Sequence, residues 1–386
     1  MASMSSQVRP FRIETSDDAL ADLRLRLQRT RWPDPETVDD WSQGIPLAYV
    51  QGLCRYWADG YDWRRAEHRL NAMPQCITEI DGCDIHFLHV RSPEPGALPL
   101  IITHGWPGSV IEFLKVIGPL TDPVAHGGDA ADAFHVVCPS LPGYGFSGKP
   151  AVAGWGIRTI AGTWAQLMAR LGYTRYGAQG GDWGSAVTSA LARHHPDPLA
   201  GIHLNMPVVS FGGLDMSDLT DGEQASLASL ADYQKRESGY STQQSTRPQT
   251  LGYGLADSPA AQCAWIVEKF RAWTDCNGDP ESVLTRDELL DNVMLYWLNG
   301  AGASSARLYW ESFDAGFGGS GSGPVDVPTG CSIFPKEIIR LSRRWAETGF
   351  SDIRYWNELD RGGHFAAFEQ PELFVRELRS FFRLVR

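Results

Sequence analysis

The chain has 386 residues, of which 43% are hydrophobic and 21% are charged, and its formal net charge at pH 7 is −12. This length is sufficient for a large buried core with one inserted or appended domain, and the composition is that of an ordinary globular protein. The negative charge argues against nucleic acid or an anionic membrane surface as a partner, because both would repel the average surface of this protein.

Cysteine and histidine are scattered along the chain. The seven cysteines form no CxxC pair and no cluster with zinc spacing, and the ten histidines show no HExxH pattern. We therefore expect free thiols, a reducing compartment and no metal. The first twenty residues lack the apolar run of a signal peptide, and no run of eighteen apolar residues occurs. We expect a soluble, cytoplasmic protein that spans no membrane.

Residues 1–76 are predicted to form a helical segment that precedes the main fold. A cap signal at Ser16 and Asp17 comes before apolar residues at helical spacing, and further helices are expected from Pro46 and from Trp63. No catalytic signal occurs in this segment. We interpret it as a meander that wraps the rest of the protein.

Strand signals begin at residue 77 and define the first part of a core at 77–207. Short apolar runs, as expected for strands covered on both faces, alternate with helical stretches near 109–120 and 156–171. The predicted strands are Ile77–Ile80, Asp84–Val90, Leu98–Thr103 and Phe134–Cys138. Alternation of this kind predicts an α/β fold with a mostly parallel sheet and crossover helices.

Residues 208–325 lack buried strand runs and carry helical segments instead. Two of these segments are Asp257–Thr274 and Arg286–Leu298, and the region ends in a glycine- and serine-rich connection at 316–323. A helical insertion late in an α/β sheet is what a lid over the active face would look like.

Residues 326–386 are predicted to complete the core. Strands are predicted again at 329–334 and at 353–356, and a final amphipathic helix is predicted to start at about Pro371. The chain therefore reads as one α/β core, interrupted by a lid and preceded by a meander.

Asp182 lies at the centre of the most informative segment, residues 175–185, which reads as a strand, a sharp turn and a helix. Gly180, Gly181 and Gly184 leave room for a strained turn that exposes the central side chain. An α/β-hydrolase carries its nucleophilic serine at such a turn. A carboxylate there attacks an electrophilic sp3 carbon instead and forms an alkyl-enzyme ester, as with epoxides and alkyl halides. The alternative is an aspartate that only caps the following helix.

A second signal is the run His104–Ser109, which follows a predicted buried strand. An α/β-hydrolase builds half of its oxyanion hole at this place. The backbone N–H groups of Trp106 and Trp183 are therefore candidates to stabilise charge on the ester of Asp182. The alternative is an ordinary His-Gly turn.

His364 is the candidate general base, because it lies between glycines and phenylalanine in a loop before the last helix and follows the nucleophile in chain order. The base needs an acid that orients it. Glu337, just after a predicted strand, is the first choice, and Asp352 and Glu358 are rivals. Glu337 could instead be a carboxylate that favours a helix N-terminus.

Taken together, these motifs resemble epoxide hydrolases of the microsomal and juvenile-hormone type over nearly the full length. The matching stretches are His-Gly-Trp-Pro-Gly-Ser at 104–109, Gly-Tyr-Gly-Phe-Ser at 143–147, Gly-Gly-Asp-Trp-Gly at 180–184, Phe-Pro-Lys-Glu at 334–337, and the run from Arg361 to Glu372. The resemblance implies an α/β-hydrolase fold with an N-terminal epoxide hydrolase segment. It also implies that Tyr240 and Tyr309 are the lid tyrosines that hold the epoxide oxygen. We expect the membrane anchor of the mammalian microsomal form to have no counterpart here.

We therefore predict an epoxide hydrolase that needs no cofactor, with Asp182, His364, Glu337, Tyr240 and Tyr309 as catalytic residues. Its expected partners are a small epoxide and water, and a homodimer is a possible assembly. A haloalkane or haloacid dehalogenase is the nearest alternative, although it would need halide donors in place of the tyrosines. A non-catalytic binding protein of the same fold is the alternative from another class. An esterase is disfavoured because no serine occupies the turn.

Overall fold

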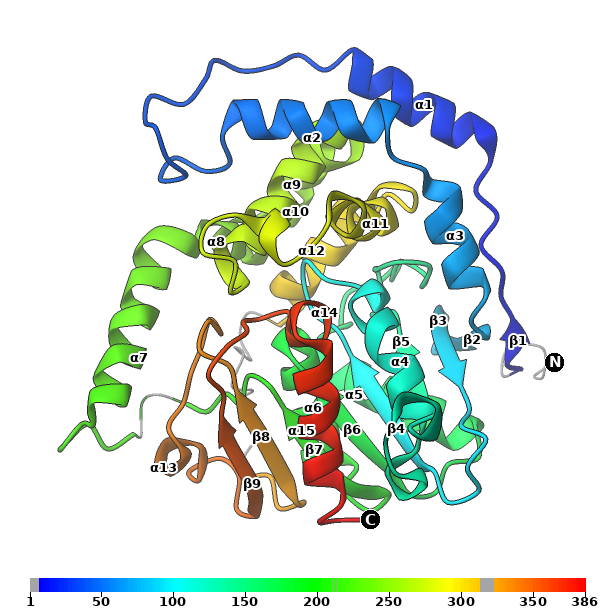
Figure 1. Cartoon of the computed structure of the whole chain (residues 1–386), viewed down its shortest axis with the longest axis vertical. Coiled ribbons are helices and arrows are strands. Elements are labelled where there is room, and N and C mark those ends of the chain that lie inside the picture. The colour runs from blue at the N-terminus through cyan, green and yellow to red at the C-terminus, as the bar shows by residue number, and fades with distance from the viewer. Residues whose placement is uncertain (1–6, 211, 213, 313–322) are drawn as a thin grey trace.

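The computed structural model describes residues 7–210, 212, 214–312 and 323–386 (Figure 1). Within this part of the chain, the centre of the molecule is a nine-stranded sheet in the order β1-β2-β3-β5-β4-β6-β7-β8-β9. The neighbouring strands β5, β4, β6, β7, β8 and β9 are parallel to one another. At the other edge, β1, β2 and β3 are antiparallel, and β3 pairs antiparallel with β5. The mostly parallel α/β sheet predicted from the sequence is confirmed.

The strands in the middle of the sheet are buried on both faces, which explains their continuous apolar runs. The β2–β3 hairpin turns at Asp81 and Gly82, both at positive φ, as a two-residue type I′ turn requires. The strands are β1 (Arg9–Pro10), β2 (Gln75–Ile80), β3 (Cys83–Val90), β4 (Leu98–Thr103), β5 (Phe134–Pro139), β6 (Tyr176–Gly180), β7 (Leu199–Leu204), β8 (Thr329–Ile333) and β9 (Ile353–Glu358).

Helices cover both faces of this sheet. In Figure 1, α4 and α15 lie in front of it and α5 and α6 lie behind it. Phe381 and Phe382, at the end of the amphipathic helix α15, belong to the buried core. The helices of the core are α4 (Leu114–Thr121), α5 (Ile157–Arg170), α6 (Asp182–His194), α13 (Arg343–Ala346), α14 (Ala366–Glu369) and α15 (Pro371–Phe382).

A group of helices between β7 and β8 lies over the carboxyl ends of the parallel strands (Figure 1). We call this group the lid. Its helices are α7 (Asp221–Asp232), α8 (Gly239–Thr246), α9 (Pro248–Asp257), α10 (Pro259–Trp273), α11 (Arg286–Trp297) and α12 (Gly302–Glu311). Ligands of open α/β sheets bind at this end of the strands, so the lid covers the place where a site is expected.

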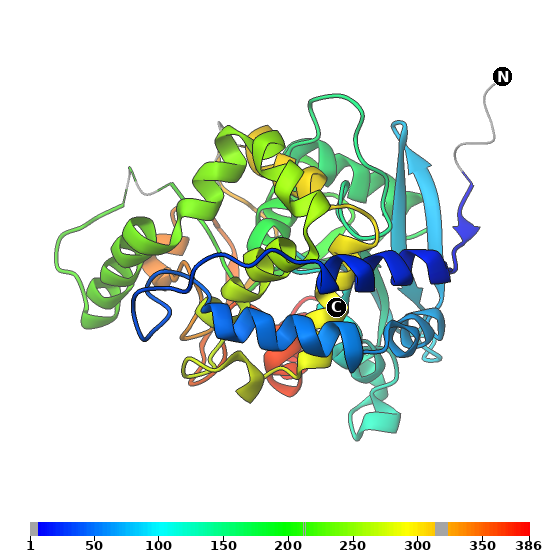
Figure 2. The same ribbon diagram turned by 90° about the horizontal axis from the view of Figure 1, so that it is seen from above.

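The N-terminal helices α1 (Asp17–Gln28) and α2 (Leu47–Asp59) run over the lid (Figure 2), and α3 (Trp63–Asn71) leads from them along one side toward β2 (Figure 1). They contact α10 and α11. Asp291, a buried carboxylate of α11, accepts hydrogen bonds from Tyr61 and Arg69, which ties this segment to the lid. The domain limits at 76, 207 and 325 stay our interpretation of the sequence.

The helix predicted over Asp257–Thr274 is present as α10, which begins at Pro259 because Ser258 is extended, as the residue before a proline prefers. β7 was not predicted, since its Leu-Ala-Gly-Ile-His-Leu has only one β-branched residue, and the short β1 was missed as well. Most of the glycine- and serine-rich connection at 316–323 lies outside the described residues.

Among the helices of the described residues, none combines the length and the apolar character that crossing a bilayer requires.

Candidate active site

Asp182 stands at the sharp turn between β6 and α6 with φ at +50° and with only 4% of its surface exposed. The turn depends on glycine at its two ends. A Cβ on Gly180 would lie 2.1 Å from the carbonyl oxygen of Gly184, and a Cβ on Gly184 would lie 2.0 Å from that of Thr103. Aspartate is among the few residues that tolerate positive φ. The local sequence therefore holds one carboxylate in a strained and fixed position.

The loop after β4 provides a donor for this carboxylate. The backbone N–H of Trp106 donates to Asp182 Oδ1 at 2.8 Å. The neighbouring His104 is structural: its Nε2 accepts from Leu141 N, and burial lowers its pKa to about 4, so it is neutral. Trp183 is the residue after Asp182, and its ring packs edge-on against Tyr309. The role of its backbone N–H stays a prediction.

His364 lies on the other side of the carboxylate. Its Nε2 is 3.4 Å from Asp182 Oδ2, and its Nδ1 is 2.5 Å from Glu337 Oε1. Burial alone would lower the pKa of His364, but the charges of Glu337 and Asp182 outweigh it and raise the pKa well above its usual value. The three side chains form one chain of contacts, from Glu337 through His364 to Asp182.

Glu337, rather than its two rivals, reaches the histidine. The loop after β8 is joined to the loop of His364 by the bond from Lys336 N to Gly362 O. Asp352 is paired with Arg354 instead. Glu358 is exposed at the end of β9 and accepts from the Trp356 indole.

Tyr240 and Tyr309 come from lid helices α8 and α12, and both are buried. The Tyr240 ring stacks on Trp106, with centroids 4.9 Å apart, and lies 5.8 Å from the Tyr309 ring. Burial raises the pKa of both phenols well above 10, and the nearby charge of Asp182 raises them further. Both phenols therefore keep their protons. The Tyr309 hydroxyl has no hydrogen-bond partner among the described residues.

A small polar cavity of about 20 Å³ lies beside Asp182 and His364. It is also lined by Glu112, Gln179 and Asn205. The buried Gln179 Oε1 has no partner among the described residues, and burial raises the pKa of Glu112 to about 8. A cavity of this size with several polar groups is suited to one water molecule.

The comparison with known proteins agrees with this geometry. Residues 8–113 match the family model of the epoxide hydrolase N terminus, and residues 99–254 match that of the alpha/beta hydrolase fold. A putative epoxide hydrolase of Stigmatella aurantiaca is 58% identical over 98% of this chain and 86% of its own length. Epoxide hydrolase 1 of Oryctolagus cuniculus is 38% identical over 98% of this chain and 89% of its own.

Solved structures of epoxide hydrolases superpose on nearly the whole of this chain. The juvenile hormone epoxide hydrolase of Bombyx mori superposes with a TM-score of 0.88 at 32% identity, covering 99% of this chain and 96% of that one. The epoxide hydrolase of Aspergillus niger gives 0.88 at 32%, covering 99% and 97%. The chain belongs to the epoxide hydrolase family. As a member of this family it is a hydrolase of small-molecule epoxides, and the dehalogenase and the non-catalytic alternative are not favoured.

This epoxide hydrolase has residues near the site that sequence reasoning missed. The Tyr233 and Tyr240 hydroxyls are 2.8 Å apart, and the ammonium group of Lys269 lies 4.9 Å from the centre of the Tyr240 ring. Lys269 is only 3% exposed, which is rare for lysine. The sequence around Lys269 in α10 does not predict this burial. Trp273 packs against both Tyr240 and His364, and the sequence around it does not predict these contacts either.

Across the described ranges, no group of three or more histidine, cysteine, aspartate or glutamate side chains is arranged to hold a metal ion. The polar side chains that meet at the site of this epoxide hydrolase are two carboxylates, one imidazole and two phenols.

Proposed function

We propose that this enzyme hydrolyses an apolar aryl or alkyl epoxide to a vicinal diol through a covalent ester on Asp182. One observation carries the proposal. Asp182 Oδ1 accepts a hydrogen bond of 2.8 Å from Trp106 N, and Oδ2 lies 3.4 Å from His364 Nε2. A carboxylate with a donor on one oxygen and a base beside the other is prepared both to attack carbon and to be released by water.

In the first step, Asp182 attacks an epoxide carbon, a C–O bond of the ring breaks, and the ring oxygen takes a proton from a phenol. Tyr240 and Tyr309 support this step because burial keeps both phenols protonated. A hydrogen bond from each would stabilise the alkoxide as charge develops on it.

Ester formation prepares His364 for the second step, because it removes the Asp182 charge, which is one of the two charges that raise the pKa of His364. The histidine can then lose its proton, which replaces the proton that the phenol gave up in the first step, and act as a base. In the second step, a water attacks the ester carbonyl while neutral His364 accepts its proton, and the carbonyl oxygen gains charge facing Trp106 N. The acyl C–O bond then breaks, and the diol leaves as its oxygen takes the proton back from His364. Glu337 remains to orient the histidine.

The water of the second step is proposed to occupy the small cavity beside Asp182 and His364. Gln179 offers an acceptor there, and Glu112, with a pKa of about 8, is protonated at neutral pH and offers a donor. Two or more polar partners are what a buried water requires. The second step would then begin with the water already next to the ester.

The substrate is proposed to be apolar because indole and phenol rings surround the carboxylate. Trp106, Trp273 and Tyr240 pack against one another there. Detoxification and the tailoring of a secondary metabolite are the two roles that we propose for this activity. All seven cysteines are unpaired, which supports a reducing compartment such as the cytoplasm. A homodimer stays a prediction.

A single turnover with excess enzyme in heavy-oxygen water tests the covalent route, with styrene oxide as the substrate. The ester route inserts an oxygen of Asp182, so the first diol carries only light oxygen, and label appears in the diol of later turnovers. Heavy oxygen in all of the first-turnover diol would mean direct attack by water and would refute the proposal.

A further inference from the structure

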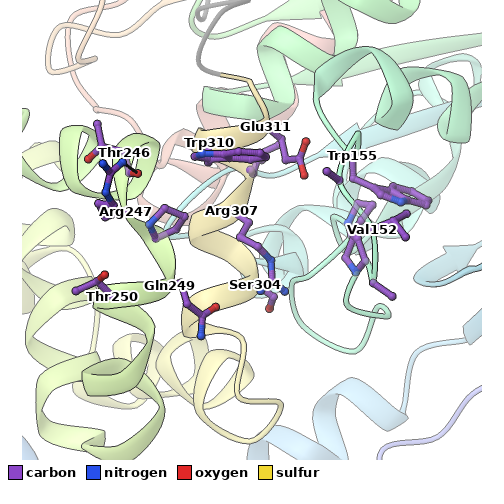
Figure 3. Close-up of a pocket in the computed structure, with 16 residues that line it drawn as sticks. Val152, Trp155, Thr246, Arg247, Gln249, Thr250, Ser304, Arg307, Trp310 and Glu311 are labelled. Atoms are coloured by element: carbon purple, nitrogen blue, oxygen red, sulfur yellow. Dashed lines mark hydrogen bonds between the residues drawn. The ribbon is translucent and has the colours of Figure 1, made fainter.

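A groove lies at the border between the lid and a loop of the core (Figure 3). It shares no lining residue with the small cavity at Asp182. Its volume is about 520 Å³, within the range of small-molecule sites. One wall is the core loop 142–155, with Val152 and Trp155. The other wall is formed by α12 and by the segment 246–250, where α8 ends and α9 begins.

The residues beside the two lid tyrosines point into this groove. On α12, Ser304, Arg307, Leu308 and Glu311 line it, and their spacing of three and four residues places them on one face of the helix. Tyr309 lies on another face and packs against Trp183. Arg247, which directly follows α8, the helix of Tyr240, also lines the groove. The hydrolysis mechanism uses the tyrosines and leaves their charged neighbours without a role.

The charge in the groove is positive although the protein is acidic overall. Neither Arg247 nor Arg307 forms an ion pair with a carboxylate of the described residues. Lys149 is a third cation nearby, and burial together with the charge of Arg307 lowers its pKa. The acidic residue of the groove, Glu311, accepts a hydrogen bond from Gly154 N at 2.8 Å, and the two arginines outnumber it.

Part of the groove lining is apolar. Trp310 is 50% exposed and Val152 is 70% exposed, whereas Leu308 and Trp155, which also line the groove, are mostly buried. In Figure 3, Arg307 on α12 lies between the loop of Val152 and the segment 246–250, and Trp310 and Glu311 lie at one end. An apolar surface next to guanidinium groups that have no acidic partner is complementary to a molecule with an apolar body and an anionic end.

We propose that this groove binds an amphipathic carboxylate of the fatty-acid type, with Arg307 and Arg247 on the carboxylate and with Trp310, Val152 and Trp155 along the chain. A guanidinium group matches a carboxylate in geometry because it offers two parallel N–H donors. The inference goes beyond the hydrolysis reaction and needs none of the chemistry at Asp182.

Calorimetric titration of the full-length enzyme with dodecanoate below its micelle concentration tests the groove. We expect saturable binding of one dodecanoate and about tenfold weaker binding in Arg307→Gln and in Arg247→Gln, since each removes one charged contact. Arg354→Gln is the matched control, because this arginine is exposed and paired with Asp352. It should bind as the wild type does.

Several outcomes would overturn the inference. Binding could be absent, or equally tight for dodecyltrimethylammonium, which has the same chain and the opposite charge. The two groove variants could also bind as tightly as the control. Competitive inhibition of epoxide turnover by dodecanoate, with undiminished binding in both variants, would move the ligand to the active site. The Asp182→Asn variant separates the two proposals, because it should lose turnover and keep dodecanoate binding.

Discussion

The core and the lid both contribute to the site, but they hold their residues by different means. In the core, Asp182 and His364 are fixed by the backbone: a positive φ at Asp182, glycines on either side of it, and a hydrogen bond from His364 N to the carbonyl oxygen of Trp273, at the end of lid helix α10. In the lid, Tyr240 and Tyr309 stand on ordinary helices and are held by ring contacts with their neighbours.

This difference matches the demands of the two steps that we propose. The nucleophile and the base must meet a carbon atom and a water with little freedom, so strain and tight loops are acceptable there. The phenols follow an oxygen that moves as the ring opens. The core should therefore govern whether an ester forms and is hydrolysed, and the lid should govern how fast it forms.

The largest effect is expected from Asp182→Asn, which keeps the tolerance for positive φ but removes the nucleophile. Diol formation should fall by about 10⁴-fold or more, as for other nucleophile deletions. The melting temperature should change little. Chiral diol analysis over long incubations measures the residual rate, and wild-type-like turnover would remove Asp182 from the mechanism.

His364→Gln should separate the two steps. Loss of the general base is expected to slow ester hydrolysis by about 10³-fold while the ester still forms. Intact-protein mass spectrometry after mixing with styrene oxide should show one added substrate mass. Turnover at the wild-type rate would mean that the base is another residue, and loss of turnover without an adduct would assign His364 to the first step.

These core residues could be predicted from the sequence because the residues next to them in the chain form recognisable loop motifs. Glycines around Asp182 and His364 are visible in the chain, and a segment that reads as a strand precedes each loop. Glu337 was harder, since Asp352 and Glu358 are also close to strands, and only the fold shows which carboxylate faces the imidazole.

The lid is different, because helical spacing predicts that a helix exists but not which of its side chains faces a site. Tyr240 and Tyr309 were found by resemblance to a family and not by any local pattern. Lys269 and Tyr233 both contact Tyr240, but no local sequence pattern points to either residue. Their contacts are therefore visible only in the structure.

Substitution of either lid tyrosine by phenylalanine should slow ester formation by about 10²-fold, as loss of one transition-state donor does elsewhere. Hydrolysis of the ester should be unaffected. Stopped-flow fluorescence of the site tryptophans can follow both steps, and Tyr253→Phe, on the exposed face of α9, is the control. An equal slowing of both steps would mean that the tyrosines only support the fold.

The pH dependence should differ between the steps for the same reason. Ester formation does not need a neutral His364. Ester hydrolysis does need one, and Glu337 raises the pKa of this histidine. Hydrolysis should therefore fall about tenfold per pH unit once the pH is below the pKa of His364 in the ester. Single-turnover rates between pH 5 and pH 9 measure both steps, and parallel profiles would contradict the assignment.

The smallest effect is expected at Glu112, whose carboxyl group lines the small cavity and also completes a capping box with Ser109. Glu112→Leu should slow ester hydrolysis by about fivefold, the value of one hydrogen bond to a held water. Glu112→Gln should restore the rate, because glutamine can donate like a protonated carboxyl group and also satisfies a capping box.

Single-turnover rates of both steps and the melting temperature distinguish the two roles of Glu112, capping its helix and holding the water. If Glu112 only caps its helix, Glu112→Leu lowers the melting temperature and slows both steps alike. If it holds the water, ester formation keeps its rate and only ester hydrolysis slows.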